Sequence, residues 1–490
     1  MQRLKPIMLV GTGSDVGKSV LAAGLCRIFK QDGYCPAPFK GQNMSLNSYV
    51  TAEGLEMGRA QVVQAEAAGV PCHTDMNPVL LKPTSDQASQ VIVNGKAIGQ
   101  QSAHDYFKEN DRSALLDTVK QAFDRLKVSY SPIVMEGAGS ISELNLKHRD
   151  ITNMRMAIHA GAATYLVADI DKGGVFGSVY GTIALLTPEE RACMKGIIIN
   201  KFRGDARLFI DGRRILEDLT GLPVVGVIPY FSNIYIEQED SVALESKFRK
   251  AAEGRVNVAV VRLRRLSNFT DFDRLESDPR VNLYYSNEPS ELARAAVILI
   301  PGSKNTLADM LDLRNNGAAR AIVQAHKAGT TVVGICGGYQ MMGETIADPL
   351  GVEGDIESIP GLGLLPIQTT LLPEKTTRQR AFTFREFPEP CEGYEIHMGQ
   401  TVFTAPPSPV AIMDDQSMDG YWLNNNTWGT YLHGILDNDR VINYLLAPYA
   451  NATSAKDLSF SEFKSAQFDR LAEIMRENLD IKTIYQTLKF

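Results

Sequence analysis

The sequence predicts an α/β protein of two doubly wound domains, each built around a mostly parallel sheet. Two observations predict this fold. Short apolar runs recur along the chain, and each is followed by a turn and then by a helical pattern, as in parallel sheets. A charged stretch with little apolar periodicity interrupts this rhythm at 232–255. We therefore expect domains at 1–231 and 256–446, a linker at 232–255, and a helical extension at 447–490 packed on the second domain.

Five apolar runs of strand length mark the first domain. Each of them ends in glycine, proline or a polar residue that begins a turn. A helical pattern follows the first run from Val20 and ends at Asp32-Gly33, a typical helix stop. The predicted strands of this domain lie at residues 7–10, 131–136, 164–168, 196–199 and 222–228.

A glycine-rich loop, residues 11–19, joins the first strand to this helix. Its glycines let backbone N–H groups converge on phosphate oxygens, and the helix start adds its positive dipole end. Lys18 is expected on the terminal phosphates and the Ser19 hydroxyl on Mg²⁺. The loop is a variant one, because Thr12 stands where the strict pattern has glycine, and a turn without a ligand is the alternative. The residues expected to bind nucleotide here are Gly11, Thr12, Gly13, Gly17, Lys18 and Ser19.

Polar side chains lie at or after the ends of two of the other strands. Glu136 ends the run at 131–136, so it is expected beside the phosphate loop as a Mg²⁺ ligand. Asp150 is a weaker candidate for contact with Mg²⁺ or a substrate. Asn200 ends the run at 196–199 and is expected to bind the nucleotide.

The second domain has predicted strands at 256–261, 295–300 and 331–335, and the third leads into a cysteine. Residues 334–338 read Gly-Ile-Cys-Gly-Gly, the form of a nucleophile elbow. The small neighbours permit a sharp strand-to-helix turn that exposes the Cys336 thiol, and the helix start favours its thiolate. A buried, inert cysteine is the alternative.

A cysteine nucleophile needs a base and an oxyanion hole. The N–H of Gly337, with an N–H near Gly302 or Ser303, is expected to form the hole. Two downstream histidines, His397 and His433, are candidates for the base, and the residues alone do not separate them. A structural histidine in the core is the alternative for each.

Taken together, these motifs resemble known families. Cys336 in its elbow, with His433, is similar to class I (triad-type) glutamine amidotransferases. The loop at 11–19, with 136–139, resembles the dethiobiotin-synthetase-like ATP-binding fold, a P-loop NTPase-like domain. The combination resembles the cobyric acid synthases of the cobalamin pathway over nearly the whole chain. The further stretches that carry this resemblance are 40–45, 169–176, 301–306 and 393–399.

The resemblance implies a reaction. Cys336 would attack glutamine and release ammonia, with His433 as proton carrier and Gln340 in the glutamine site. ATP with Mg²⁺ would phosphorylate a carboxylate of the corrinoid adenosylcobyrinic acid a,c-diamide, with Asp150 as a catalytic contact. Ammonia would then displace the phosphate, and four carboxylates would become the amides of adenosylcobyric acid.

One departure from the usual pattern concerns the third triad residue. Class I amidotransferases have glutamate two residues after the histidine, where this chain has Ile435. Asp437 and Glu395 are the candidates to orient His433.

Two other functions remain open on the sequence. One is the related synthase that amidates the a and c carboxylates of cobyrinic acid, and the other is a nucleotide switch with a glutamine-sensing domain. The net charge of −7 over 490 residues argues against nucleic-acid binding, and no apolar run is long enough for a membrane span. We expect a cytoplasmic protein with small-molecule substrates and no tightly bound prosthetic group, and its oligomeric state stays open.

Overall fold

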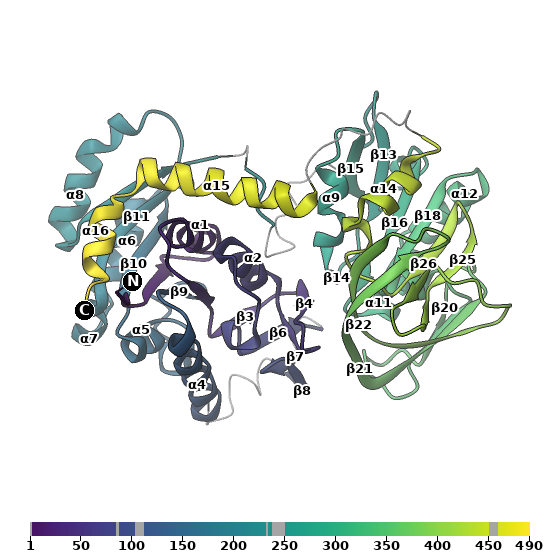
Figure 1. The fold of residues 1–490 in the computed structure, drawn as a ribbon, viewed down its shortest axis with the longest axis horizontal. Coiled ribbons are helices and arrows are strands. Elements are labelled where there is room, and N and C mark those ends of the chain that lie inside the picture. The colour runs from purple at the N-terminus through teal and green to yellow at the C-terminus, as the bar shows by residue number, and fades with distance from the viewer. Residues whose placement is uncertain (1, 85–87, 103–111, 232–233, 238–249, 450–458) are drawn as a thin grey trace.

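The computed structural model describes residues 2–84, 88–102, 112–231, 234–237, 250–449 and 459–490. Most of the expected linker at 232–255 lies outside these ranges. The chain forms two units side by side, an N-terminal unit before residue 232 and a C-terminal unit from residue 250 to 449 (Figure 1). Within the described ranges, every helix is too short or too polar to cross a bilayer.

The N-terminal unit contains the expected parallel sheet. Its strand order is β12-β11-β10-β1-β9-β2, and all of its pairs are parallel. All five predicted runs are strands, and β2 was not predicted. The strands are β1 (Ile7–Gly11), β2 (Ala37–Phe39), β9 (Ile133–Glu136), β10 (Ala163–Asp169), β11 (Met194–Phe202) and β12 (Val224–Pro229).

Helices cover both faces of this sheet, as the doubly wound fold requires. On one face the core includes α1 (Lys18–Gln31). The helices on the opposite face are α4 (Ser113–Ser129), α5 (Met154–Ala160), α6 (Val175–Ala184) and α8 (Ile210–Thr220). The strands are buried on both sides, which explains why they read as continuous apolar runs.

The C-terminal unit has a second six-stranded sheet in the order β15-β13-β16-β18-β26-β25, parallel except for its last pair. The three predicted runs are β13, β16 and β18. Helices α11 (Thr306–Asn315), α12 (Ala318–Lys327) and α14 (Asp439–Leu446) pack against it. The strands are β13 (Val256–Val261), β15 (Val281–Ser286), β16 (Val297–Ile300), β18 (Thr331–Ile335), β25 (Tyr421–Asn424) and β26 (Thr427–Thr430).

Two further sheets meet where the units touch, a four-stranded one in the N-terminal unit and a six-stranded one in the C-terminal unit. A four-stranded sheet in the N-terminal unit lies toward the long antiparallel ribbon β21 (Ile367–Phe384) and β22 (Pro390–Phe403) of the C-terminal unit (Figure 1). The hairpin β4 (Ser48–Val50) and β5 (Glu56–Gly58) contacts this ribbon directly. The four strands of the small sheet are β3 (Gln42–Met44), β6 (Val79–Pro83), β7 (Ala88–Val93) and β8 (Lys96–Ser102).

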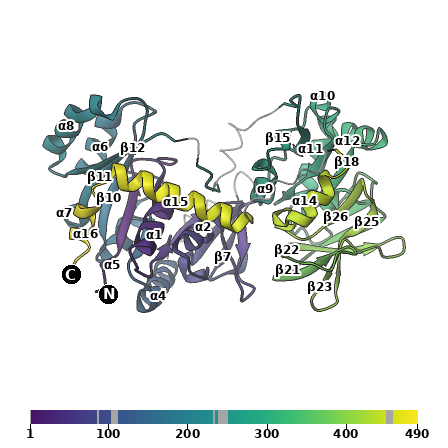
Figure 2. The same ribbon diagram turned by 45° about the horizontal axis from the view of Figure 1, so that its top comes forward.

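The C-terminal helices pack on the N-terminal unit, so the prediction that residues 447–490 cover the second domain was wrong. Helix α15 (Phe460–Asn478) lies along α1, where a Cβ on Gly24 would come within 2.0 Å of Met475 Sδ (Figures 1 and 2). Helix α16 (Ile481–Thr487) follows on the same unit. The apolar side chains of α15 that fill this face are Phe468, Leu471, Ala472 and Met475. The apolar spacing predicted a helix correctly, but this spacing does not determine which surface the apolar side chains pack against.

Candidate active site

Cys336 stands at the turn between β18 and the short helix α13 (Gly337–Met341). Its φ of 53° and ψ of −111° place a side-chain-bearing residue in a region that favours glycine. The glycines around it allow close packing, since a Cβ at Gly338 would lie 1.9 Å from the carbonyl oxygen of Ile300. The predicted elbow geometry is therefore confirmed, and the thiol is presented at the end of the sheet.

Two backbone amides lie beside this thiol. A Cβ built on Gly337 would be 2.8 Å from the backbone nitrogen of Ser303, so the two residues are immediate neighbours. Gly302 has a different environment, since a Cβ there would be 3.3 Å from His433 Cε1. Of the two positions expected to complete an oxyanion hole with Gly337, Ser303 has the closer backbone nitrogen.

His433 is held by a buried carboxylate. Its Nδ1 lies 2.7 Å from Asp271 Oδ2, and the N–H of Gly434 donates to Asp271 Oδ1 at 3.0 Å. Both side chains are fully buried. Burial disfavours the imidazolium, but the charge of Asp271 and then that of Cys336, with hydrogen bonds to both, raise the pKa of His433 to about 10. A Cys–His–Asp arrangement results, the set of groups that a thiol nucleophile, its base and the residue that orients the base require.

Asp271 is the residue that the sequence analysis missed. Glu395 and Asp437, the two residues predicted to orient His433, are not its carboxylate partner. Glu395 pairs with Arg380 and lies 3.6 Å from His397 Nε2. The carboxyl of Asp437 is buried, which raises its pKa to about 8. Asp271 precedes His433 by 162 positions and sits in a short 3₁₀-helix, so no local motif marks it.

His397 also lies in the pocket that contains Cys336 and His433. Its Nδ1 lies 3.0 Å from the carbonyl oxygen of Gly399, and its ring stacks on Tyr431 at 3.8 Å between centroids. These contacts hold the ring without a carboxylate on Nδ1. His433, which has both Asp271 and Cys336 as partners, is the better placed base.

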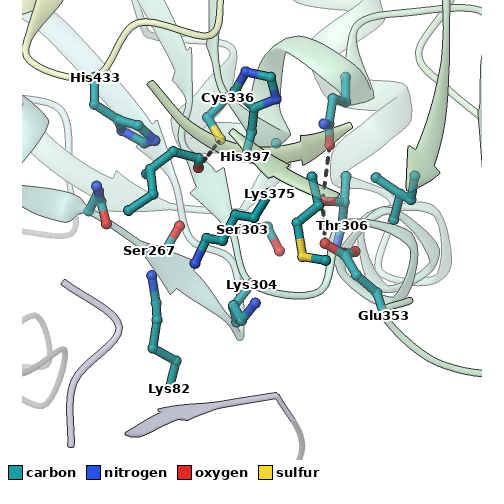
Figure 3. Close-up of a pocket in the computed structure, with 16 residues that line it drawn as sticks. Lys82, Ser267, Ser303, Lys304, Thr306, Cys336, Glu353, Lys375, His397 and His433 are labelled. Atoms are coloured by element: carbon teal, nitrogen blue, oxygen red, sulfur yellow. Dashed lines mark hydrogen bonds between the residues drawn. The ribbon is translucent and has the colours of Figure 1, made fainter. Parts of the chain in front are cut away.

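A pocket of about 40 Å³ opens beside the thiol (Figure 3). Gln340 is one of its lining residues, and its Nε2 donates to the Tyr431 hydroxyl at 3.2 Å. Lys304 and Lys375 approach the pocket from the C-terminal unit and Lys82 from the N-terminal unit, so the pocket lies at the junction. Glu56 of the N-terminal unit pairs with Lys82 at 2.8 Å and also with Lys375. The junction is thus joined by buried charges directly at the pocket.

Replacing Asp271 with asparagine should lower kcat for glutamine hydrolysis about 10²–10⁴-fold. Without the carboxylate, the largest contribution that raises the pKa of His433 is lost, so this pKa falls and less of the imidazole is protonated at a given pH. The pH profile of kcat/KM for glutamine, measured with Asp437→Asn as the control, tests this. An Asp271→Asn profile equal to that of the unmodified chain would contradict the assignment.

The phosphate loop lies between β1 and α1 with Lys18 folded into it. Lys18 Nζ donates to the carbonyl oxygens of Gly13 at 2.9 Å and Gly139 at 3.0 Å. A Cβ on Gly11 would be 2.8 Å from the carbonyl oxygen of Gly13, which belongs to the backbone, so the loop needs glycine there. Asn200 Nδ2 donates to the carbonyl oxygen of Val16 at 2.8 Å and thus lies directly against the loop. The predicted strand, loop and helix context is confirmed.

Glu136 and Ser19 lie together at the end of the phosphate loop. Ser19 Oγ donates to Glu136 Oε1 at 2.7 Å, Lys40 Nζ lies 3.0 Å from the same oxygen, and Gln64 Nε2 donates to Oε2 at 2.7 Å. A hydroxyl and a carboxylate are oxygen ligands of the kind Mg²⁺ takes together with substrate phosphates. These two residues therefore fit a Mg²⁺ ion that arrives with a nucleotide.

Asp150 lines a second pocket, of about 230 Å³, which also includes Gly139 and therefore borders Lys18. Its carboxylate accepts from the N–H groups of Thr152 at 2.9 Å and Asn153 at 3.0 Å. Burial raises the pKa of Asp150. The basic residues that line the same pocket are Arg112, Lys147, Arg149 and Arg155.

Two family models match the chain. Residues 7–242 match the CobQ/CobB/MinD/ParA nucleotide binding domain, and residues 257–441 match the CobB/CobQ-like glutamine amidotransferase domain. Curated relatives named cobyric acid synthase align over the full length. The chain is 61% identical to that of Parabacteroides distasonis over 100% of its own length and 99% of the relative. It is 60% identical to that of Bacteroides fragilis over 99% of each chain. The chain therefore belongs to the cobyric acid synthase family of cobalamin biosynthesis and is a carbon–nitrogen ligase that takes its amide nitrogen from glutamine.

Proposed function

We propose that the chain converts adenosylcobyrinic acid a,c-diamide to adenosylcobyric acid by amidating four peripheral carboxylates. At each one, ATP transfers its γ-phosphoryl group to the carboxylate and gives an acyl phosphate and ADP. Ammonia attacks the acyl carbon, the C–O bond to phosphate breaks, and an amide and inorganic phosphate are released.

The glutamine reaction would proceed at Cys336. Its thiolate attacks the side-chain amide of glutamine, and the backbone N–H groups of Gly337 and Ser303 receive the developing oxyanion. The His433 imidazolium, oriented by Asp271, gives a proton to the departing ammonia. The thioester left on Cys336 is hydrolysed by water, which His433 deprotonates, and glutamate is released.

The synthetase reaction would proceed between the phosphate loop and the pocket of Asp150. Lys18 leaves its carbonyl partners and binds the terminal phosphates, while Ser19 and Glu136 hold the metal. The metal would supply positive charge next to the phosphates of the nucleotide. The basic lining around Asp150 suits a substrate with several carboxylates, and Asp150 itself contacts the reacting group.

The observation that carries the proposal is the Cys336–His433–Asp271 arrangement in one chain with a phosphate loop. The test is phosphate release from ATP with Mg²⁺ and glutamine, with and without adenosylcobyrinic acid a,c-diamide, followed by mass analysis of the corrinoid. We expect release that depends on the diamide, with up to four replacements of OH by NH₂. Preference for cobyrinic acid would favour the a,c-diamide synthase, and glutamine binding without turnover would favour a sensor.

A further inference from the structure

A segment of the N-terminal unit packs against the residues that support the glutamine site. Asn47 and Ser48, at the start of β4, cross the junction. Asn47 Oδ1 accepts from the backbone N–H of Phe269 at 3.0 Å. The backbone N–H of Ser48 donates to Asn268 Oδ1 at 3.3 Å, and Asn268 Nδ2 donates to the carbonyl oxygen of Ser48 at 3.2 Å. All of these groups are buried from solvent.

These bonds act on the short helix that carries Asp271. Asn268 begins this 3₁₀-helix, Phe269–Phe272, and has a φ of 51°, a left-handed conformation that needs support outside glycine. Its own side chain makes no capping bond to the helix. The first N–H of the helix is satisfied by Asn47 instead, so the cap comes from the other unit.

The same segment reaches His433 from its opposite side. The hydroxyl of Tyr394 accepts from Asn268 Nδ2 at 3.0 Å and donates to the carbonyl oxygen of Ser48 at 3.3 Å. Its ring stacks on His433 at 5.3 Å between centroids. The backbones of Tyr394 and His433 also exchange two hydrogen bonds, of 3.0 and 2.9 Å. Both members of the Asp271–His433 pair are thus held through Ser48 and Asn47.

We propose that Asn47 and Ser48 are positioning residues for glutamine hydrolysis, and that the Asp271–His433 pair reaches its working geometry only against this segment. Among the described residues, neither one lines the pocket of Cys336 or that of Asp150, so they act through Asn268 and Tyr394. The inference rests on the proposed roles of Cys336 and His433.

The chain just before this segment contacts the nucleotide site. Lys40, a few residues before Asn47, lies 3.0 Å from Glu136, which accepts the Ser19 hydroxyl. Between them, β3 pairs with β6 in the small sheet at the junction. One short stretch of chain therefore touches both the proposed metal ligand and the support of the glutamine site.

The test is an Asn47→Leu variant, which keeps the side-chain size and removes the acceptor for the Phe269 N–H. We expect kcat for glutamine hydrolysis to fall about tenfold, the size expected for one lost buried hydrogen bond. KM for glutamine and synthesis with free ammonia should stay within about twofold of the unmodified chain, because Asn47 lines neither the pocket of Cys336 nor that of Asp150. Tyr394→Phe, which keeps the stacked ring and removes the hydroxyl, should lower the same kcat by a smaller factor.

Thr377→Val is the matched control, since Thr377 Oγ1 donates across the same junction to the carbonyl oxygen of Gly54 at 2.8 Å and touches neither Asn268 nor Tyr394. An equal fall of kcat in this variant would mean general loosening of the junction and would overturn the proposal. Full glutamine turnover in both Asn47→Leu and Tyr394→Phe would overturn it as well. Cys336→Ala is assayed in parallel: if it too keeps glutamine turnover, the proposed function fails and not this inference alone.

Discussion

Replacement of Cys336 with alanine should abolish glutamine-dependent amidation, by at least about 10³-fold in kcat, and leave amidation with free ammonia unchanged. Only the thiolate forms the thioester, and no other cysteine lines the pocket in the described part of the chain. Alanine keeps a Cβ at the position with φ 53°, so the elbow backbone is preserved. Product formation is measured with glutamine and then with an ammonium salt at saturating ATP.

Cys391→Ala is the matched control for this variant. Cys391 is also a buried cysteine of the C-terminal unit, but it lies on β22 away from the pocket lining. It should keep both activities. Glutamine turnover that survives in Cys336→Ala would mean that the nucleophile is wrongly assigned. Loss of the ammonia reaction would mean that the variant disturbs the synthetase as well.

Replacement of Lys18 with alanine should remove synthesis with either nitrogen source, by about 10²–10³-fold in kcat, because each amide requires the phosphorylated carboxylate. Lys18 is buried in the loop, where its ammonium is held by two carbonyl oxygens, and the loop pattern predicts that it binds the terminal phosphates. The assay is corrinoid-dependent phosphate release with saturating ammonia, where the glutaminase contributes nothing.

Two measurements show whether this loss is specific. Lys30→Ala, a change at the far end of the same helix α1, should keep full activity. Glutamine hydrolysis by Lys18→Ala without ATP should match that of the unmodified chain, since Cys336 and His433 belong to the other unit. Retained phosphate release in Lys18→Ala would refute its role at the nucleotide.

The buried parallel strands were predictable because each is a continuous apolar run. The ribbon of β21 and β22 was not, since its exposure alternates along β21 and polar residues interrupt the apolar ones. The packing surface of the C-terminal helices could not be predicted either. Their apolar period predicts a helix, and the surface that receives it depends on the completed fold.

The functional residues also divide into those that the sequence reveals and those that it does not. The phosphate loop and the elbow at Cys336 are contiguous motifs, and short-range sterics of glycine determine their shape, so the sequence reveals them. Asp271 and Asn47 act through partners that are distant in sequence, and neither has a spacing that identifies it. Such residues become visible only when the junction of the two units is in place.

The position of α15 and α16 bears on how the chain is made. The backbone N–H of Lys5 donates to the carbonyl oxygen of Leu488, and Leu471 and Met475 lie in the core beside β1. A ribosome delivers the N-terminal unit first, but that unit lacks one wall of its core until α15 and α16 have been synthesised. The C-terminal unit has its own core by then. The unit that is synthesised first is therefore the last to complete its hydrophobic core.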